Sequence, residues 1–265
     1  EKIDIRRYLP TLVLVVILLV AAYLRLHKIS DYMTFLGDEG RDVLVVKRMI
    51  VDHDLTLLGP TASVGGFYLG PIYYYFMVPF LWLWNLDPTG PAIMVALFGI
   101  ATVYLVYVVG RDFFGRRAGL VSSAAYAVSP LAIAMSRSSW NPNIVPFFSL
   151  LLIYLLWRSI VKKESFLLFW VGVILGIGLQ LHYLFLFLFG VAFVWYLVTG
   201  RRRELVRFYA LGIAGVIVGF SPFIAFELLK GFPNTQTIIR YLGSGEDTGF
   251  SLLRAAGTVS EVTFR

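Results

Sequence analysis

The chain has 265 residues, of which 58% are hydrophobic and only 15% are charged, and its mean hydropathy is +0.78. A soluble domain usually carries about a quarter charged residues, so this composition excludes a soluble enzyme or DNA-binding domain. Cysteine is absent, which excludes disulfides, a thiolate nucleophile and a cysteine-based metal site. The formal net charge of +7 could suggest nucleic acid as a partner. Ten of the 23 basic residues lie in three short connections between apolar segments, however, and three more lie at the N-terminus, which indicates membrane topology and no nucleic acid.

Seven apolar segments are expected to cross a membrane as helices, which predicts an all-α polytopic membrane protein. Runs of about 18 or more nearly uncharged residues are typical of membrane spans. The stretch 165–199 is too long for one helix in a hydrocarbon core of ~30 Å, so we expect a hairpin that turns at residues 180–183. The predicted spans are residues 9–26, 91–110, 118–135, 143–157, 165–180, 183–199 and 208–228.

The orientation of these spans follows from three basic connections and a basic N-terminus. The basic residues are Lys2, Arg6 and Arg7, then Arg111, Arg116 and Arg117, then Arg158, Lys162 and Lys163, and finally Arg201, Arg202, Arg203 and Arg207. The positive-inside rule places them all in the cytoplasm only if residues 70–86 do not span. That segment is rich in tyrosine and tryptophan, so we expect it at the interface or re-entrant, with an ordinary span as the alternative. Residues 27–90 then form one long extracytoplasmic loop with surface helices, and residues 231–265 lie outside as well.

The first outer loop contains four charges in the short sequence from Asp38 to Asp42. Gly37 and Asp38 resemble a helix start with Asp38 as the N-cap, followed by a surface helix that ends near residues 52–54. A carboxylate at this position could accept a proton from an attacking hydroxyl, and the planar fork of Arg41 could bind a phosphate. Solvated helix-capping charges are the alternative interpretation.

Family resemblance favours the functional interpretation of this loop. An N-terminal span followed closely by an Asp-Glu pair, Asp38 and Glu39, opens the pattern. The segments Gly70-Pro71-Ile72-Tyr73-Tyr74-Tyr75, Gly110 to Arg117 and Ser129 to Arg137 continue it. In this order and spacing the chain resembles the GT-C superfamily of membrane glycosyltransferases, and more narrowly the protein O-mannosyltransferase and lipid A aminoarabinose transferase group. The resemblance implies a GT-C-like transmembrane module over residues 1–230. Members are longer, so we expect residues 231–265 to begin a further region.

The resemblance also implies a function. It predicts a membrane glycosyltransferase that moves a sugar, with inversion, from a polyprenyl-phosphate donor to an extracytoplasmic protein, lipid or glycan acceptor. Asp38 would be the general base and Glu39 would support it, while the lipid phosphate leaves. The lipid-linked sugar phosphate is the donor substrate, and no separate cofactor is expected. We expect the protein in the cell membrane of a bacterium or an archaeon.

Five further residues are candidates for substrate contacts. Arg137 lies at the outer end of the third span, where a positive charge could bind the donor phosphate or simply snorkel to the interface. Arg240 is a donor-phosphate candidate by resemblance alone. Tyr73, Asn141 and His182 are candidates for the substrate pocket, because all three lie at the expected outer level. Polar caps that face water at chain turns are the alternative for His182.

Some chemistries and functions receive less support from the sequence. The three histidines, His27, His53 and His182, are scattered without paired ligand spacing, so no metal site is predicted. A transporter or lipid flippase remains an alternative, although the polar residues gather at the outer surface and no internal repeat is evident. A non-catalytic assembly subunit is a third possibility.

Six glycines are interpreted as sites of close helix packing, namely Gly172, Gly176, Gly178, Gly212, Gly215 and Gly219.

Overall fold

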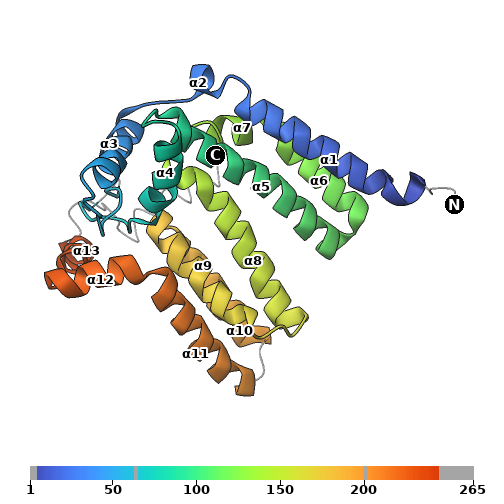
Figure 1. Ribbon diagram of the computed structural model, residues 1–265. Coiled ribbons are helices and arrows are strands. Elements are labelled where there is room, and N and C mark those ends of the chain that lie inside the picture. The colour runs from blue at the N-terminus through green and yellow to red at the C-terminus, as the bar shows by residue number, and fades with distance from the viewer. Residues whose placement is uncertain (1–4, 63–64, 200–201, 245–265) are drawn as a thin grey trace, which may run out of the picture.

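The computed structural model describes residues 5–62, 65–199 and 202–244, and this part of the chain is almost entirely helical (Figure 1). Its extended structure is one isolated antiparallel bridge between Thr61 and Tyr68. The predicted all-α class is therefore confirmed. The expectation for residues 231–265 falls largely outside the described residues, because the description ends at Ser244.

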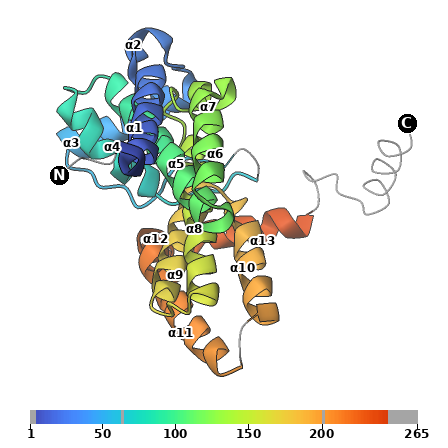
Figure 2. The ribbon, with the colours of Figure 1, turned by 90° about the vertical axis from the view of Figure 1, so that its right-hand side faces the viewer.

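The helices form a bundle in which the long helices pack side by side. The elements are α1 (Ile5–Leu26), α2 (Ile29–Tyr32), α3 (Gly37–Val51), α4 (Ile72–Leu83), α5 (Thr89–Phe114), α6 (Arg116–Val128), α7 (Pro130–Met135), η1 (Asn141–Ile144), α8 (Val145–Val161), α9 (Leu167–Leu181), α10 (Phe185–Thr199), α11 (Arg202–Gly219), α12 (Ser221–Lys230) and α13 (Pro233–Ser244). Helices α1 and α6 pack on α5, α5 packs on α8, α8 on α9, and α9 on α11, with α10 against α8 and α9 (Figure 2).

The two ends of this bundle differ in chemistry. The short helices α2, α3 and α4 gather at one end, while the α5–α6 and α8–α9 connections lie at the opposite end (Figure 1). The helix ends that border these connections carry Arg111, Arg116 and Arg117 at the first and Arg158 at the second, where Lys162 follows α8. The separation agrees with the predicted topology, in which the basic connections share one side of the membrane.

Helix length supports an integral membrane protein, although the number of spans stays a prediction. In the described residues, α1, α5 and the continuous run Asn141–Val161 are long and apolar enough to cross a membrane, and the bent pair α11–α12 adds a fourth. The seven predicted spans correspond to α1, α5, α6–α7, α8, α9, α10 and α11–α12. Helix α4 has 12 residues and is about 18 Å long, which agrees with the prediction that this segment does not span.

Two predicted spans are not continuous helices. The predicted span 118–135 is divided, because Ser129 adopts an extended conformation and Pro130 starts α7. Proline has no backbone N–H to donate and cannot continue the preceding helix. The predicted span 208–228 likewise bends by 72° between α11 and α12. Pro222 is the physical reason, because a proline has no N–H to donate and cannot continue α11. It lies in the first turn of α12, where a proline is tolerated because a helix begins there.

A buried arginine fixes the end of α1. The side chain of Arg25 is fully buried and donates hydrogen bonds to the carbonyl oxygens of Ala127, at 2.9 Å, and Tyr126, at 3.3 Å, near the end of α6. It also donates to Ser136 Oγ at 3.3 Å. Carbonyl groups at a helix C-terminus carry partial negative charge, which balances the guanidinium without a carboxylate. Arg25 therefore ties α1 to the break between α6 and α7.

The packing of α9 against α11 depends on direct backbone contact at glycines. A Cβ atom at Gly215 would lie 2.0 Å from the carbonyl oxygen of Phe169, and one at Gly172 would lie 2.1 Å from that of Gly212. Similar backbone approaches occur at Gly176 and Gly219, whereas a Cβ at Gly178 would meet the ring of Phe185 on α10. The prediction of close packing is confirmed at these five glycines. The backbone of Gly212 takes part in this contact through its carbonyl oxygen, but its own Cβ position is open, with nothing within 4 Å.

We expect Gly215→Ala to destabilise the protein, because the methyl group must push two helix backbones apart. Overpacking of this kind costs about 1–3 kcal/mol. Gly212→Ala is the matched control on the same helix and should leave the melting temperature within a degree or two, because its methyl group enters open space. Thermal unfolding in one detergent measures both variants. Equal losses in the two would contradict the packing described here.

Candidate functional site

The first turns of α3 place three charged side chains on one face of the helix. Asp38, Arg41 and Asp42 are spaced i, i+3 and i+4, so their side chains are neighbours. The predicted N-cap role of Asp38 is wrong, because α3 already begins at Gly37 and Leu36 is the flanking residue. Asp38 instead lies inside the first turn, where a carboxylate is stabilised by the positive end of the helix dipole.

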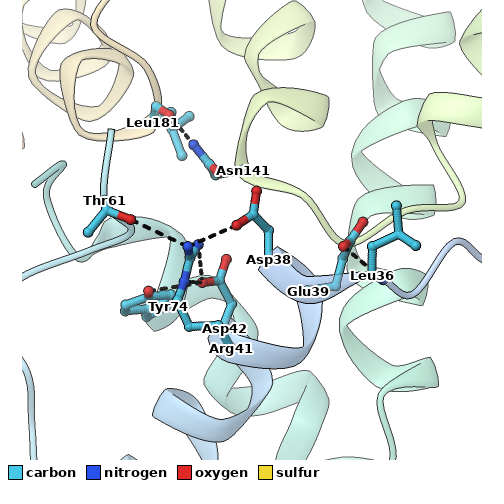
Figure 3. A network of polar contacts seen from close by, with 9 residues as sticks. All are labelled: Leu36, Asp38, Glu39, Arg41, Asp42, Thr61, Tyr74, Asn141 and Leu181. Carbon is cyan, nitrogen blue, oxygen red and sulfur yellow. Dashed lines mark hydrogen bonds and ion pairs between the residues drawn. The ribbon is translucent and has the colours of Figure 1, made fainter. Parts of the chain in front are cut away.

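Arg41 is shared by two carboxylates (Figure 3). Its Nε and Nη2 atoms both donate to Asp42 Oδ1, at 2.9 and 2.8 Å. Its Nη1 atom donates to Asp38 Oδ1 at 2.9 Å and to Thr61 Oγ1 at 3.4 Å. Two nitrogens thus fix the guanidinium to the protein interior, and the third faces the more exposed side of the site.

The two carboxylates differ in burial and therefore in chemistry. The side chain of Asp42 is fully buried, whereas that of Asp38 is 52% exposed. The hydroxyl of Tyr74 donates to Asp42 Oδ1 at 3.0 Å, while Asp42 Oδ2 has no hydrogen-bond partner among the described residues. Burial raises the pKa of Asp42 to about 6, although Arg41 acts in the opposite direction. Burial and the charge of Asp42 also raise the pKa of Tyr74, which stays a hydrogen-bond donor.

Glu39 faces away from Arg41 (Figure 3). Its carboxylate is buried, with Oε1 accepting from Ser138 Oγ at 2.7 Å and Oε2 accepting from the Leu36 N–H at 3.0 Å. These bonds satisfy one free N–H at the start of α3 and fasten the helix to the segment that follows α7. The geometry gives Glu39 a role in positioning α3, and the predicted catalytic support stays a prediction.

Two adjoining pockets share Arg41 and Thr61. The first, which we call the Asp38 pocket, is lined by Asp38, Arg41, Thr61, Asn141, His182 and Tyr183, among others. The second, which we call the Arg48 cleft, has a volume of about 320 Å³ and is lined by Arg41, Arg48, Asp54, Thr56, Tyr68 and Tyr74, among others. The structure therefore brings together four predicted site residues, Asp38, Arg41, Asn141 and His182, from segments far apart in sequence.

Asn141 and His182 belong to the wall of the Asp38 pocket. The Nδ2 atom of Asn141 donates to the carbonyl oxygen of Leu181 at 2.6 Å, so its amide holds the end of α9. His182 Nδ1 accepts from the Leu184 N–H at 3.2 Å, and its ring stacks on that of Tyr183. Burial lowers the pKa of His182, which favours a neutral imidazole in the pocket.

Three other predicted residues line neither pocket. Tyr73 is fully buried in the core. Arg137 donates from Nη2 to the carbonyl oxygen of Leu24 and lies over the ring of Tyr32, with 5.2 Å to the ring centroid. Arg240 is exposed on α13 and donates back to Gln236 within its own helix. Their predicted substrate contacts stay predictions that this geometry does not support.

Sequence reasoning missed Asp42, Thr61 and Tyr74 as parts of the site. The helical spacing of Asp42 from Asp38 could have indicated it, because i and i+4 positions share a face. No local signal marks Thr61, which reaches Arg41 through the path of the loop. Tyr74 lies in the segment from Gly70 to Tyr75 that contributes to the family resemblance, and it reaches Asp42 because α4 packs on α3. Within the described ranges, no group of three or more His, Cys, Asp or Glu side chains is placed to hold a metal ion.

The raised pKa of Asp42 predicts a pH-dependent stability. Between pH 7 and pH 5 the native protein takes up a proton at Asp42 that the unfolded chain, with an aspartate pKa of about 4, does not. Protonation of Asp42 therefore adds to the free energy of unfolding. This stabilisation is fully present below about pH 4 and is lost as the pH rises through 6. For a shift of about two units it amounts to at most about 3 kcal/mol.

The wild-type melting temperature should therefore rise, relative to that of Asp42→Asn, when the pH falls from 7 to 5. Asp31→Asn, at an exposed carboxylate on α2, is the control and should follow the wild type. Parallel pH profiles for the wild type and Asp42→Asn would contradict the assignment.

Comparison with known proteins adds an independent line of evidence. Residues 69–226 match the family described as dolichyl-phosphate-mannose-protein mannosyltransferase. Over 83 residues the chain is 31% identical to YkcB of Bacillus subtilis (strain 168), which is named as a mannosyltransferase, and the match covers 31% of this chain and 12% of YkcB.

The fold is similar to that of ArnT from Cupriavidus metallidurans, solved as a crystal structure bound to undecaprenyl phosphate. The TM-score is 0.64 at 18% sequence identity, and the similarity covers 91% of this chain and 44% of ArnT. The chain thus spans less than half the length of ArnT. Because the family match extends over more than half of the chain, and the fold agrees with it, the predicted GT-C membership is confirmed and the chain belongs to the dolichyl-phosphate-mannose-protein mannosyltransferase family.

Proposed function

We propose that this chain forms the donor-binding and acceptor-activating part of a membrane glycosyltransferase that uses a polyprenyl-phosphate-linked sugar. Family membership supports the reaction class, and the undecaprenyl phosphate bound to ArnT supports the class of donor. The observation on which the proposal rests is the pairing of Asp38 with Arg41 in a pocket at one end of the bundle.

In this reaction an acceptor hydroxyl attacks the anomeric carbon of the donor sugar. The new bond joins the acceptor oxygen to that carbon, and the bond from the carbon to the phosphate oxygen breaks. The hydroxyl proton passes to Asp38, which is exposed enough to meet an acceptor. The electron pair leaves with the polyprenyl phosphate, whose charge Arg41 stabilises. A single direct displacement inverts the anomeric configuration, and one base is sufficient for it.

The guanidinium of Arg41 would couple donor binding to the hydrogen bond that it donates to Asp38, the proposed base. In the structure, Arg41 Nη1 donates to Asp38. A donor phosphate would compete for the same nitrogen, while Nε and Nη2 stay fixed on Asp42. Donor binding would then free the Asp38 carboxylate to accept a proton only when the phosphate is in place.

The position of the site supports a transferase over a transporter or a flippase. The Asp38 pocket lies at the end of the bundle opposite the basic connections, which we infer to be the extracytoplasmic end. Transport sites usually lie near the middle of the membrane and are formed by discontinuous helices. The acceptor would therefore approach from the extracytoplasmic side of a cell membrane.

The test is transfer by the full-length protein from undecaprenyl-phosphate-linked mannose and aminoarabinose donors. We expect Asp38→Asn to lower kcat by about 10²–10⁴-fold, because the amide cannot accept the proton. Arg41→Ala should raise KM for the donor and lower kcat together, since the same group binds and stabilises the phosphate.

Asp31→Asn is the matched control and should retain wild-type turnover, because Asp31 lies on α2 and lines neither pocket. Normal turnover by Asp38→Asn would show that the base has been assigned incorrectly.

A further inference from the structure

A hairpin between α3 and α4 forms a wall of both pockets. Its two sides, residues 59–62 and 65–70, are joined by three backbone hydrogen bonds of 2.8 to 2.9 Å. Thr61 lines the Asp38 pocket and the Arg48 cleft, Leu69 lines the pocket, and Tyr68 lines the cleft. We call this element the pocket hairpin. Its position therefore decides the shape of both pockets.

The pocket hairpin also reaches the charged group on which the proposed function depends. Thr61 Oγ1 accepts a hydrogen bond from Arg41 Nη1 at 3.4 Å (Figure 3). The same nitrogen donates to Asp38 Oδ1 and, in the proposed function, meets the donor phosphate. A shift of the hairpin would remove Thr61 from this nitrogen and change how the guanidinium is held.

The side-chain amide of Asn234, from the second half of the chain, holds the pocket hairpin in place. Asn234 Oδ1 accepts from the Tyr68 N–H at 2.7 Å, and Asn234 Nδ2 donates to the Tyr68 carbonyl oxygen at 2.9 Å. The amide thus pairs with the backbone of one residue in the way that a neighbouring strand would. Asn234 is 4% exposed, so little water can compete for these two hydrogen bonds.

Asn234 is itself held by a buried carboxylate. Glu227 accepts from the backbone N–H of Asn234 at 3.1 Å and from that of Thr235 at 2.8 Å. These two N–H groups belong to the first turn of α13, where a helix has free donors and attracts negative charge. Glu227 therefore fixes the start of α13 and, with it, the amide that pairs with the hairpin.

The tip of the pocket hairpin contacts the same helix. The ring of Phe67 lies 6.3 Å from that of Tyr241 on α13 and 6.4 Å from that of Tyr183, which lines the Asp38 pocket. A Cβ atom at Gly65 would lie 2.8 Å from the Tyr241 ring, so the absence of a side chain at Gly65 permits this approach. The hairpin is thus enclosed between α13 and the pocket.

We propose that Asn234 is a positioning residue for the transfer reaction, which acts through the pocket hairpin to keep Thr61 on Arg41. This inference rests on the proposed function. Asn234 lines neither pocket, so it acts only through the hairpin. Both Asn234 and its partner Glu227 lie beyond residues 69–226, the part of the chain that matches the family.

The first measurement is hydrogen exchange of the Tyr68 amide in the full-length protein in nanodiscs. Asn234→Ala removes both hydrogen bonds, and we expect exchange in a peptide that covers this amide to become about tenfold faster. Gln236→Ala, at an exposed position on the same helix, is the matched control and should leave this exchange unchanged.

A second variant keeps this test available if Asn234→Ala does not fold. Asn234→Asp keeps the size of the side chain and loses the N–H donor, so the Tyr68 carbonyl meets a second acceptor oxygen and exchange should again be faster. Exchange at the wild-type rate in the Asn234 variants would overturn the proposal.

The second measurement is a double-mutant cycle on kcat/KM, with the undecaprenyl-phosphate-linked donor that the wild type uses. Thr61→Val replaces the hydroxyl with a methyl group, and loss of one hydrogen bond should lower kcat/KM about fivefold. We expect Asn234→Ala to lower kcat/KM about tenfold and the double variant also about tenfold, because both changes break the same contact. The KM for the donor should rise, because Arg41 binds the donor phosphate in the proposed function.

A purely structural role for Asn234 gives a different result. Loss of folded protein would lower kcat without changing KM, and its effect would multiply with that of Thr61→Val to about fiftyfold. Such a product in an active enzyme would overturn the role of Asn234 alone. Absence of transfer by the wild type would instead overturn the proposed function and, with it, the role of Asn234 in transfer.

Discussion

A cationic side chain next to a membrane needs its charge balanced in place, and for Arg41 the buried Asp42 provides that balance. Two nitrogens of the guanidinium reach one oxygen of this carboxylate, so its orientation is set from inside the protein. The third nitrogen remains for Asp38, Thr61 and, in our proposal, the donor phosphate. The different roles of the two carboxylates follow from their burial. The buried Asp42 orients Arg41, and the more exposed Asp38 is, in our proposal, available to accept a proton.

The loop that forms the opposite wall of the site is held by side chains from the second half of the chain. The amide of Asn234 pairs with both the N–H and the carbonyl of Tyr68, at 2.7 and 2.9 Å. Glu227 accepts from the first N–H groups of α13 and so fixes Asn234. Gln180 is fully buried and bridges the Ile72 N–H to the carbonyl of Gly219. The bend between α11 and α12 therefore matters, because it directs α12 and α13 toward this loop.

Several features could be predicted from sequence because they depend on local chemistry. The apolar segments, the hairpin near His182 and the surface helix that begins beside Asp38 all follow from composition and spacing. The breaks at Pro130 and Pro222 were missed, although proline marks both, because hydropathy alone favours a continuous span. The role of Arg25 could not be predicted, since two of its partners are backbone carbonyls of α6, which leave no trace in the sequence.

The sequence by itself determined that this is an all-helical membrane protein, because hydropathy and charge bias are local properties. The order of its motifs indicated the resemblance to the GT-C superfamily, and it predicted Asp38 and Arg41 as site residues. Only the tertiary structure decided which other residues join them. It brought Asn141 and His182 to the pocket and directed Glu39, Arg137 and Tyr73 elsewhere. The physical reason is that a side chain's neighbours depend on how distant helices pack, and this packing is set by backbone contacts and buried polar groups far from the site.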